Sequence, residues 1–304
     1  MQADAEPLRV RNIGADVAVG DWVVVSADHE RVEHVLPRRS AFVRRSSFEG
    51  DRAVAHTIAA NIDIVVLVHA LTAPPNQRRL ERELVLAFDS GASPVVVLTK
   101  NDLVADPTET VAALEAVAPG VPVMLASGIT GDGIDDVRVL LREHGTMALL
   151  GASGVGKSTL INALVGEERL RTNAVREGDQ RGRHTTTAVE LVRLHPRAGH
   201  THGWLIDTPG VRAVSLWASG HGIERAFVDV FDLADRCRFR DCKHEDEPGC
   251  AVQAAIAAGE LDPRRLDAVK RLVAEEQALE EEQWAQEKAL DKRGARRPRR
   301  GRAG

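Results

Sequence analysis

Short apolar runs with strand-like spacing recur through the middle of the chain, and stretches with helical spacing separate them. Six runs predict strands, namely Ile62–Val68, Pro94–Leu98, Val121–Leu125, Met147–Leu150, Val189–Leu194 and Trp204–Ile206. Apolar positions three and four apart predict helices at residues 77–90, 107–117, 134–144 and 157–165. This alternation predicts an α/β fold with a mostly parallel sheet and helices on both of its faces.

The two ends of the chain have different patterns. Near the N-terminus, Val17–Val19, Trp22–Val25 and Val32–Leu36 predict a small β region. Beyond about residue 218 only helical patterns remain, at residues 222–234, 251–258 and 263–288. We therefore divide the chain into a β region (1–47), an α/β domain (48–218), a helical domain (219–290) and a tail (291–304).

A phosphate-binding loop is predicted between the strand Met147–Leu150 and the helix that follows it. Residues 151–158 fit G-x-x-x-x-G-K-[ST] at every fixed position. The glycines let backbone N–H groups turn toward phosphates, and the helix directs its positive end at them. Lys157 would neutralise the β- and γ-phosphate oxygens, and the Ser158 hydroxyl would ligate Mg²⁺. The expected contacts are Gly151, Ala152, Ser153, Gly154, Val155, Gly156, Lys157, Ser158 and Thr159.

A guanine-recognition motif is predicted at Thr99, Lys100, Asn101 and Asp102, directly after the strand Pro94–Leu98. It resembles the [NT]-K-x-D motif of GTPases. The Asp102 carboxylate would accept hydrogen bonds from guanine N1–H and the 2-amino group, and adenine offers neither donor there. The Lys100 stem would lie over the base. Thr99 stands where asparagine is commoner, which would alter how this loop is tied to the phosphate-binding loop. Taken alone, the motif also fits an ordinary strand-to-loop turn.

A second loop at the base is predicted after the strand Val121–Leu125. Residues 127–134 read SGITGDGI and resemble the S-A-K-x-G-x-G-[IL] segment of GTPases, whose backbone contacts guanine O6. Ser127 and Gly128 are the expected contacts, and Gly128 stands where alanine is usual.

Two segments are candidates for sensing the γ-phosphate. Asp207 and Gly210 match D-x-x-G after the strand Trp204–Ile206, with Asp207 holding Mg²⁺ through water and the Gly210 amide contacting the γ-phosphate. Upstream, residues 181–187 read RGRHTTT. We expect Thr186 to complete the Mg²⁺ ligands, with Thr185 as the alternative.

The catalytic group is less obvious than the binding groups. Ras-like GTPases have a glutamine after D-x-x-G that orients the attacking water, and here that residue is Val211. Valine cannot orient water, so we expect slow intrinsic hydrolysis. His184 is the nearest polar candidate for catalysis, together with Thr186; the alternative for His184 is a loop histidine without a role.

The order of these motifs along the chain is unusual. In ordinary GTPases the phosphate-binding loop precedes the two base-recognition segments. Here the segments at 99–102 and 127–134 precede the loop at 151–158. The order is therefore circularly permuted, and the chain leaves the α/β domain just after D-x-x-G, beside the segment that would respond to the γ-phosphate.

Composition adds a candidate metal site. The only three cysteines, Cys237, Cys242 and Cys250, lie close together with His244. Three thiolates and one imidazole are a recognised tetrahedral Zn²⁺ set, so we predict one structural zinc ion, with free buried thiols as the alternative.

Charge and hydropathy restrict where the protein acts. The chain of 304 residues has a net charge of −5 and 43% hydrophobic residues, which is ordinary for a globular protein. The N-terminus lacks an apolar signal sequence and no run reaches the length of a membrane span, so we expect a cytoplasmic protein without membrane contact. Residues 291–304 carry seven basic residues and one acid, which predicts a disordered tail that attracts polyanions, with a merely solubilising tail as the alternative.

Together, the permuted order, RHTTT (183–187), DTPGV (207–211) and RDCKHEDEPGCAV (240–252) resemble the ribosome small-subunit-dependent GTPase A (RsgA) family of bacteria over about residues 15–285. The resemblance implies an N-terminal OB-fold, a permuted GTPase domain and a zinc-binding domain. It also implies GTP hydrolysis in late maturation of the small (30S) ribosomal subunit, stimulated by that subunit, with His184 acting in hydrolysis.

The N-terminal region departs from this family pattern. Only Val17–Phe42 resembles the latter part of an OB-fold, and aromatic residues are 3% of the chain. We therefore expect rRNA contact directed mostly at phosphates, through Arg38, Arg39, Arg44, Arg45 and the tail. Two alternatives remain, a GTP-gated RNA- or protein-binding module with incidental hydrolysis and an ATP-dependent enzyme. We expect GTP and GDP as ligands and a monomeric state, since no dimer signal is evident.

Overall fold

The protein is described here by a computed structural model, which describes residues 8–12, 16–45, 55–141, 145–166, 189–194, 203–207 and 221–295. Several predicted functional residues lie outside these ranges: His184, Thr185, Thr186 and Gly210.

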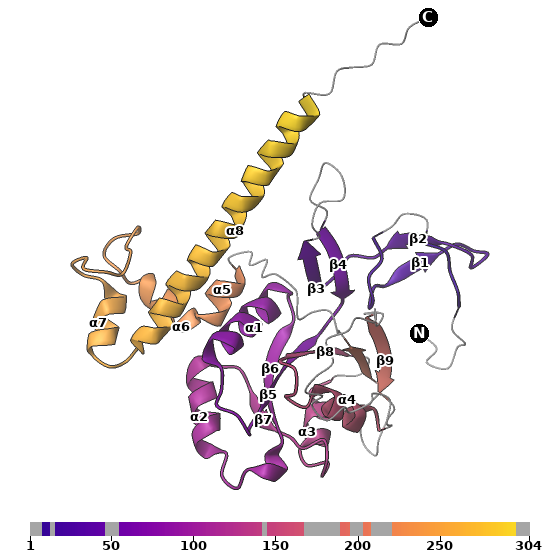
Figure 1. The fold of residues 1–304 in the computed structure, drawn as a ribbon, viewed down its shortest axis with the longest axis horizontal. Helices are drawn as coiled ribbons and strands as arrows, with labels where there is room; N and C mark the ends of the chain where they lie inside the picture. Colours follow the sequence, from indigo (N-terminus) through magenta and orange to yellow (C-terminus); the bar gives the residue numbers. More distant parts are fainter. Residues whose placement is uncertain are drawn as a thin grey trace, which may run out of the picture.

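A six-stranded sheet forms the centre of the molecule (Figure 1). Its strands lie in the order β7 (Val123–Leu125), β6 (Ser93–Thr99), β5 (Ile64–Ala70), β8 (Thr146–Gly151), β10 (Gly203–Asp207) and β9 (Glu190–Leu194). All neighbouring pairs are parallel except β10 and β9. The predicted α/β fold is confirmed, and each of the six predicted strands is present within two residues of its expected bounds.

Helices pack on both faces of the sheet because alternate residues of a strand point to opposite sides. Val65 and Leu67 of β5 belong to a hydrophobic core that includes α1 and α2, whereas Val66 and Val68 belong to a second core with α3 and α4. A strand buried on both faces reads as a continuous apolar run, which explains its strong sequence signal. The helices are α1 (Gln77–Asp89), α2 (Thr108–Val117), α3 (Ile134–Val139) and α4 (Lys157–Val165).

The N-terminal region consists of two separate antiparallel pairs. Strand β1 (Val23–Val25) pairs with β2 (Val32–Val35), and β3 (Ala41–Arg45) pairs with β4 (Ala55–Ala60). The predicted strand Val17–Val19 is wrong, because it contributes only an isolated bridge from Val19 to Ala59. The β3–β4 pair crosses the boundary expected at residue 47. Its second strand reads AHTIAA, whose alanines favour strands weakly, so the strand depends on its pairing with β3.

Arg38 has a structural role that its neighbours in the sequence do not reveal. A guanidinium carries five N–H donors. Those of Arg38 are directed at both carboxylate oxygens of Asp21, the side chain and carbonyl of Asp16, and the Thr57 hydroxyl. The expected contact of Arg38 with RNA phosphates would require these hydrogen bonds to be exchanged, because all five donors are engaged within the protein. The Arg39 side chain is 69% exposed and lies 3.2 Å from Asp63.

The C-terminal helices share a core with the α/β domain. They are α5 (His221–Ala226), α6 (Val228–Ala234), α7 (Ala251–Ala257) and α8 (Pro263–Ala295). Phe227, Val252 and Leu266 belong to the same buried cluster as Leu80 of α1 and Leu114 of α2. The far half of α8 projects from the body of the molecule (Figure 1). Helix α8 extends to Ala295, so residues 291–295, expected to be part of a disordered tail, are helical. A basic residue run does not by itself end a helix, because lysine and arginine are good helix formers.

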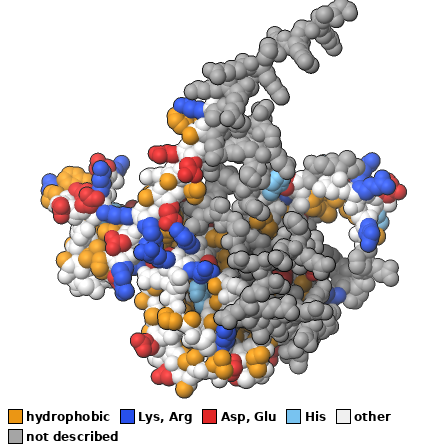
Figure 2. Space-filling view, in the orientation of Figure 1, with side chains coloured by type: hydrophobic (Ala, Val, Ile, Leu, Met, Phe, Trp, Pro, Cys, Tyr) orange, Lys and Arg blue, Asp and Glu red, His pale blue; other side chains and the backbone are white. Residues whose placement is uncertain are grey.

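Ion pairs join α1 to α8 across this interface. Arg82 lies 2.6 Å from Glu275, and Arg271 lies 2.6 Å from the buried Glu81. Lys and Arg side chains gather on the face where these helices meet (Figure 2). None of the helices in the described part of the chain combines the length and the apolar character that crossing a membrane requires.

Candidate functional site

The predicted nucleotide-binding segments meet at one edge of the central sheet. Strands β5, β6, β7, β8 and β10 run parallel, so their carboxyl ends lie at the same edge. The phosphate-binding loop follows β8, the guanine motif follows β6, the Ser127 loop follows β7, and Asp207 ends β10. Segments that are far apart in a permuted sequence thus converge on the edge where open α/β sheets bind ligands.

The phosphate-binding loop connects β8 to the start of α4. Gly151 has φ of 147°, and a Cβ at that position would lie 2.4 Å from the Val68 carbonyl oxygen, so the loop requires glycine there. Lys157 is the first residue of α4, and its Nζ donates to the carbonyl oxygens of Gly151, at 2.8 Å, and Ala152. The Ser158 hydroxyl group belongs to an exposed residue beside it. The loop therefore presents the lysine and the serine together at the positive end of a helix.

Thr99 ties the guanine motif to the phosphate-binding loop. Its hydroxyl is hydrogen-bonded to the carbonyl oxygen of Val155 in that loop and lies 3.1 Å from the His69 carbonyl oxygen in β5. Thr99 is 2% exposed. A hydroxyl can donate to a nearby carbonyl as an asparagine amide can, so threonine at this position still connects the two loops.

Asp102 is held by the loop after β7. The Ser127 hydroxyl donates to Asp102 Oδ1 at 2.5 Å, and the same oxygen of Ser127 accepts N–H bonds from Ile129 and Thr130. Lys100, two residues before Asp102, has φ of 62°, a left-handed conformation that non-glycine residues rarely adopt. Both segments are thus fixed in shape, with one carboxylate oxygen of Asp102 bonded internally. The sequence suggested a backbone role for Ser127 but gave no signal of this side-chain contact.

The departure at Gly128 has a steric cause. A Cβ on this residue would lie 2.8 Å from the carbonyl oxygen and 2.9 Å from the carbonyl carbon of Thr159 in α4. Real Cβ atoms do not approach a backbone so closely. The Ser127 loop therefore passes over α4 at a distance that only glycine permits.

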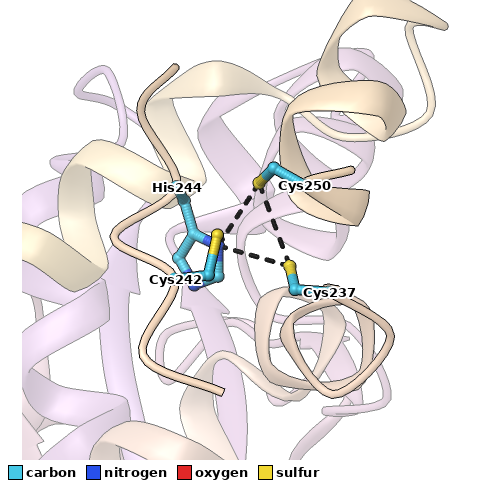
Figure 3. A group of neighbouring side chains, drawn as sticks. All are labelled: Cys237, Cys242, His244 and Cys250. Carbon is cyan, nitrogen blue, oxygen red and sulfur yellow. Dashed lines mark hydrogen bonds between the residues drawn. The ribbon is translucent and has the colours of Figure 1, made fainter. Parts of the chain in front are cut away.

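Three thiols and one imidazole converge between α6 and α7 (Figure 3). The ligand atoms of Cys237, Cys242, His244 and Cys250 all lie within 4.8 Å of one another. The Sγ atoms of Cys237 and Cys250 are 3.9 Å apart, and His244 Nδ1 lies 3.6 and 3.5 Å from them. This group could hold a metal ion. The four residues that the sequence grouped by spacing are therefore together in space.

The surroundings shift Cys237 and His244 toward their metal-binding forms, whereas burial raises the pKa of the Cys242 thiol to about 11. Burial raises the pKa of the Cys237 thiol, but backbone N–H donors from Val252 and Ala251 outweigh burial, and the net pKa lies below its ordinary value. Burial, with help from the charge of Lys270, lowers the pKa of His244 and so favours the neutral imidazole. Gln253 holds the His244 carbonyl oxygen at 2.8 Å. Thiolate and neutral imidazole are the forms that bind metals.

A protein-family model matches the part of the chain that contains these motifs. The model described as RsgA GTPase matches residues 35–217, which include both base-recognition segments, the phosphate-binding loop and D-x-x-G.

Curated relatives match over most of the chain. The protein named small ribosomal subunit biogenesis GTPase RsgA from Streptomyces coelicolor is 46% identical over 279 residues, covering 90% of this chain and 72% of the relative. The protein of the same name from Streptomyces avermitilis is 47% identical with the same coverage.

Two solved structures share the fold. The crystal structure of YjeQ from Thermotoga maritima matches with a TM-score of 0.65 and 26% identity, covering 90% of this chain and 92% of that one. That of YloQ, described as a circularly permuted GTPase, matches with a TM-score of 0.63 and 25% identity, covering 91% and 89%.

Proposed function

The chain belongs to the RsgA GTPase family, and on that premise we propose that it hydrolyses GTP and acts in maturation of the small (30S) ribosomal subunit, which stimulates hydrolysis. The observation that carries the proposal is the convergence of the phosphate-binding loop, Asp102 and Asp207 at one edge of the sheet. The proposed site of action is the cytoplasm, where bacterial subunits mature, and the proposed form is a monomer.

The roles at the nucleotide site follow from the chemistry of each group. Lys157 and the backbone N–H groups of residues 151–159 would bind the phosphates, and the Ser158 hydroxyl would ligate Mg²⁺. Asp207 would act on the same ion through water. The ion, when bound, neutralises charge that develops on the phosphate oxygens. Thr186 as a second Mg²⁺ ligand, Gly210 at the γ-phosphate and His184 in hydrolysis remain proposals from the sequence.

Guanine recognition is proposed for Asp102, supported by the Ser127 loop. The Ser127 hydroxyl fixes Asp102 at 2.5 Å, so the carboxylate is oriented before the base arrives. A carboxylate that is already oriented loses less conformational entropy when the base binds. Adenine would leave the carboxylate without the two donors that guanine supplies.

We propose Zn²⁺ as the ion of the Cys/His cluster. A tetrahedral site with Zn–S bonds of about 2.3 Å needs sulfur atoms about 3.8 Å apart. The Cys237 and Cys250 sulfurs are 3.9 Å apart, and three thiolates suit a soft ion. Four protein ligands leave no open position, so the proposed role is structural.

Nucleotide selectivity tests the guanine assignment directly. The protein is expected to bind GDP much more tightly than ADP. Asp102→Asn should lose about a hundredfold or more of GDP affinity and should gain affinity for xanthosine diphosphate, because the amide can donate to the 2-carbonyl of xanthine. Titration calorimetry with the three diphosphates measures this, with the exposed Asp135→Asn as the control. Equal affinity of the wild type for ADP and GDP would overturn the assignment.

A further inference from the structure

We propose that the loop between the metal ligands Cys237 and Cys242 is an RNA-binding tip, in which the Phe239 ring stacks on an unpaired base while Arg238 and Arg240 contact backbone phosphates. We call Arg238, Phe239 and Arg240 the RFR tip. The proposal rests on the proposed function, because the RNA is that of the small ribosomal subunit.

The RFR tip is exposed and carries unneutralised charge. All three residues are exposed, and Phe239 keeps 42% of its surface open to solvent although the Arg238 guanidinium lies 5.4 Å from its ring centre. No ion pair joins Arg238 or Arg240 to any residue in the part of the chain that the structure describes. Residues 235–243 hold four basic and two acidic side chains. The tip therefore attracts a polyanion.

The shape of the tip is fixed before any partner binds. Cys237 and Cys242 belong to the metal cluster and hold both ends of the loop. The Arg238 N–H donates to the Gly249 carbonyl oxygen at 3.1 Å. Gly249 has φ of 82°, and a Cβ there would lie 3.1 Å from Arg238 Cβ, so the arginine stem lies across a glycine that makes room for it. A preordered loop loses little conformational entropy on binding.

Two of the four acids that follow the tip, Glu245 and Glu247, are engaged within the domain. Glu247 accepts the backbone N–H groups of Lys243 and Glu245, each at 2.8 Å. The Glu245 carboxylate lies 3.6 Å from Lys270. These two carboxylates are thus directed at donors of the domain, whereas neither tip arginine has a carboxylate partner among the described residues.

Unpaired RNA fits this combination better than a protein surface or duplex RNA. An aromatic ring beside guanidinium groups binds a single-stranded base by stacking and its flanking phosphates by charge-assisted hydrogen bonds. The narrow major groove of duplex RNA would not admit the ring. Arg38, one of the arginines expected to contact phosphates, is hydrogen-bonded within the protein, whereas the RFR tip supplies two exposed arginines.

The test measures binding of the full-length, zinc-loaded chain with a non-hydrolysable GTP analogue to purified small ribosomal subunits. Phe239→Ala and Phe239→Leu should weaken binding about 5- to 140-fold, the effect of losing about 1–3 kcal/mol of base stacking. Phe239→Tyr keeps the ring and should bind like the wild type. The control is Trp284→Ala, which removes another exposed aromatic residue that lies beneath a cation, Lys288, and should leave binding unchanged.

Two further measurements separate stacking from a general loss of fold. Chemical probing of the rRNA should reveal a base that the wild type and Phe239→Tyr protect and that Phe239→Ala and Phe239→Leu leave open. Arg238→Gln and Arg240→Gln should each lower the salt dependence of binding by about one unit of log K against log salt, as expected for one phosphate contact. Metal content identifies any variant that has lost its cluster.

The outcomes distinguish this proposal from the proposed function. If the wild type does not bind small subunits, the proposed function fails and the RNA-binding tip fails with it. If the wild type binds and Phe239→Leu binds equally well, the subunit role stands and base stacking by Phe239 is wrong. If both arginine variants keep the wild-type salt dependence, the phosphate contacts are wrong.

Discussion

The absence of a side chain at Gly128 allows two parts of the nucleotide site to lie in contact. It follows Ser127, whose hydroxyl orients Asp102, and it lies against the backbone of Thr159 in the helix that begins at the phosphate-binding loop. The two halves of the nucleotide site therefore touch at Gly128. An alanine, although usual at this position in the wider class, would have to push the halves apart here.

We predict that Gly128→Ala weakens GDP affinity about tenfold, because overpacking of about 1–3 kcal/mol would displace the Ser127 loop and with it the Asp102 carboxylate. Titration calorimetry measures the change. Ile129→Ala, which alters the exposed next residue, is the matched control and should bind GDP normally. Unchanged affinity in Gly128→Ala would mean that the loop can move without disturbing the base contact.

For single residues, the sequence predicted which side chains belong to the functional sites better than it predicted their hydrogen-bond partners. The motif positions follow from fixed chemical requirements, so roles for Lys157 and Asp102 could be predicted from spacing. The four Cys/His residues were grouped in the same way, and their ligand atoms lie within 4.8 Å of one another. The link from Thr99 to Val155 and the role of Arg38 depend on which segments meet in space. Nothing in the linear pattern around Arg38 distinguishes an arginine that binds RNA from one that is fully bonded to aspartates.

Helix α8 is joined to the rest of the molecule by Arg265. Its guanidinium is bonded to both carboxylate oxygens of Asp229, to the carbonyl oxygen of Val117 at the end of α2 and to that of Ala226 at the end of α5. It also lies 4.2 Å from the Phe227 ring centre. A cation at two helix C-termini satisfies carbonyls that lack intrahelical partners.

We predict that Arg265→Ala destabilises the protein by about 3 kcal/mol, since it leaves two carbonyls and a partly buried carboxylate without a partner. Arg265→Lys should not rescue stability, because an ammonium cannot form the same fork. Urea unfolding measures both. The neighbouring Arg264→Ala is the control and should be nearly neutral, because the Arg264–Asp262 pair is largely exposed. Equal effects of the two alanine variants would contradict the role given to Arg265.

The Cys/His cluster joins the chain segments on either side of His244, from Cys237 to Cys250. We predict that the purified chain contains one Zn²⁺ and that Gln253→Ala lowers zinc affinity about tenfold, because Gln253 orients His244 through its carbonyl oxygen. His244 also has a left-handed φ of 56°, which needs such support. Competition with a chromogenic chelator measures the affinity, with the exposed Gln277→Ala as the control. A chain purified without metal, or a Gln253 variant with normal affinity, would contradict this prediction.

Elements with strong periodicity could be predicted, and those that depend on pairing could not. The buried strands β5 and β6 are continuous apolar runs, so they stand out in the sequence. Strands β3 and β4 are short and contain several alanines, so their pairing is set by the surrounding structure. The end of α8 was placed too early, because the basic residues after Lys288 are as compatible with a helix as with a tail.

Over the whole molecule, the C-terminal helices pack on the side of the sheet that α1 and α2 cover. The sheet ends at Asp207 of β10, and the next described helix, α5, packs against α1, where the Gly222 N–H donates to Asp89 at 2.7 Å. The C-terminal helices therefore share a core with α1 and α2. The permuted order was evident from the sequence, but this shared core was not, because it joins residues such as Leu80 and Leu266 that are distant along the chain.

The central claim is that this GTPase is coupled to the small ribosomal subunit, and steady-state GTP hydrolysis with and without purified small subunits tests it most directly. The account predicts slow hydrolysis by the protein alone, because valine follows Gly210, and at least a tenfold rise when subunits are added. His184→Ala measured in parallel should lose that rise if His184 acts in hydrolysis, and should keep it if it does not. A rate that no ribosomal particle changes would contradict the account and would favour a GTP-gated binding module with incidental hydrolysis.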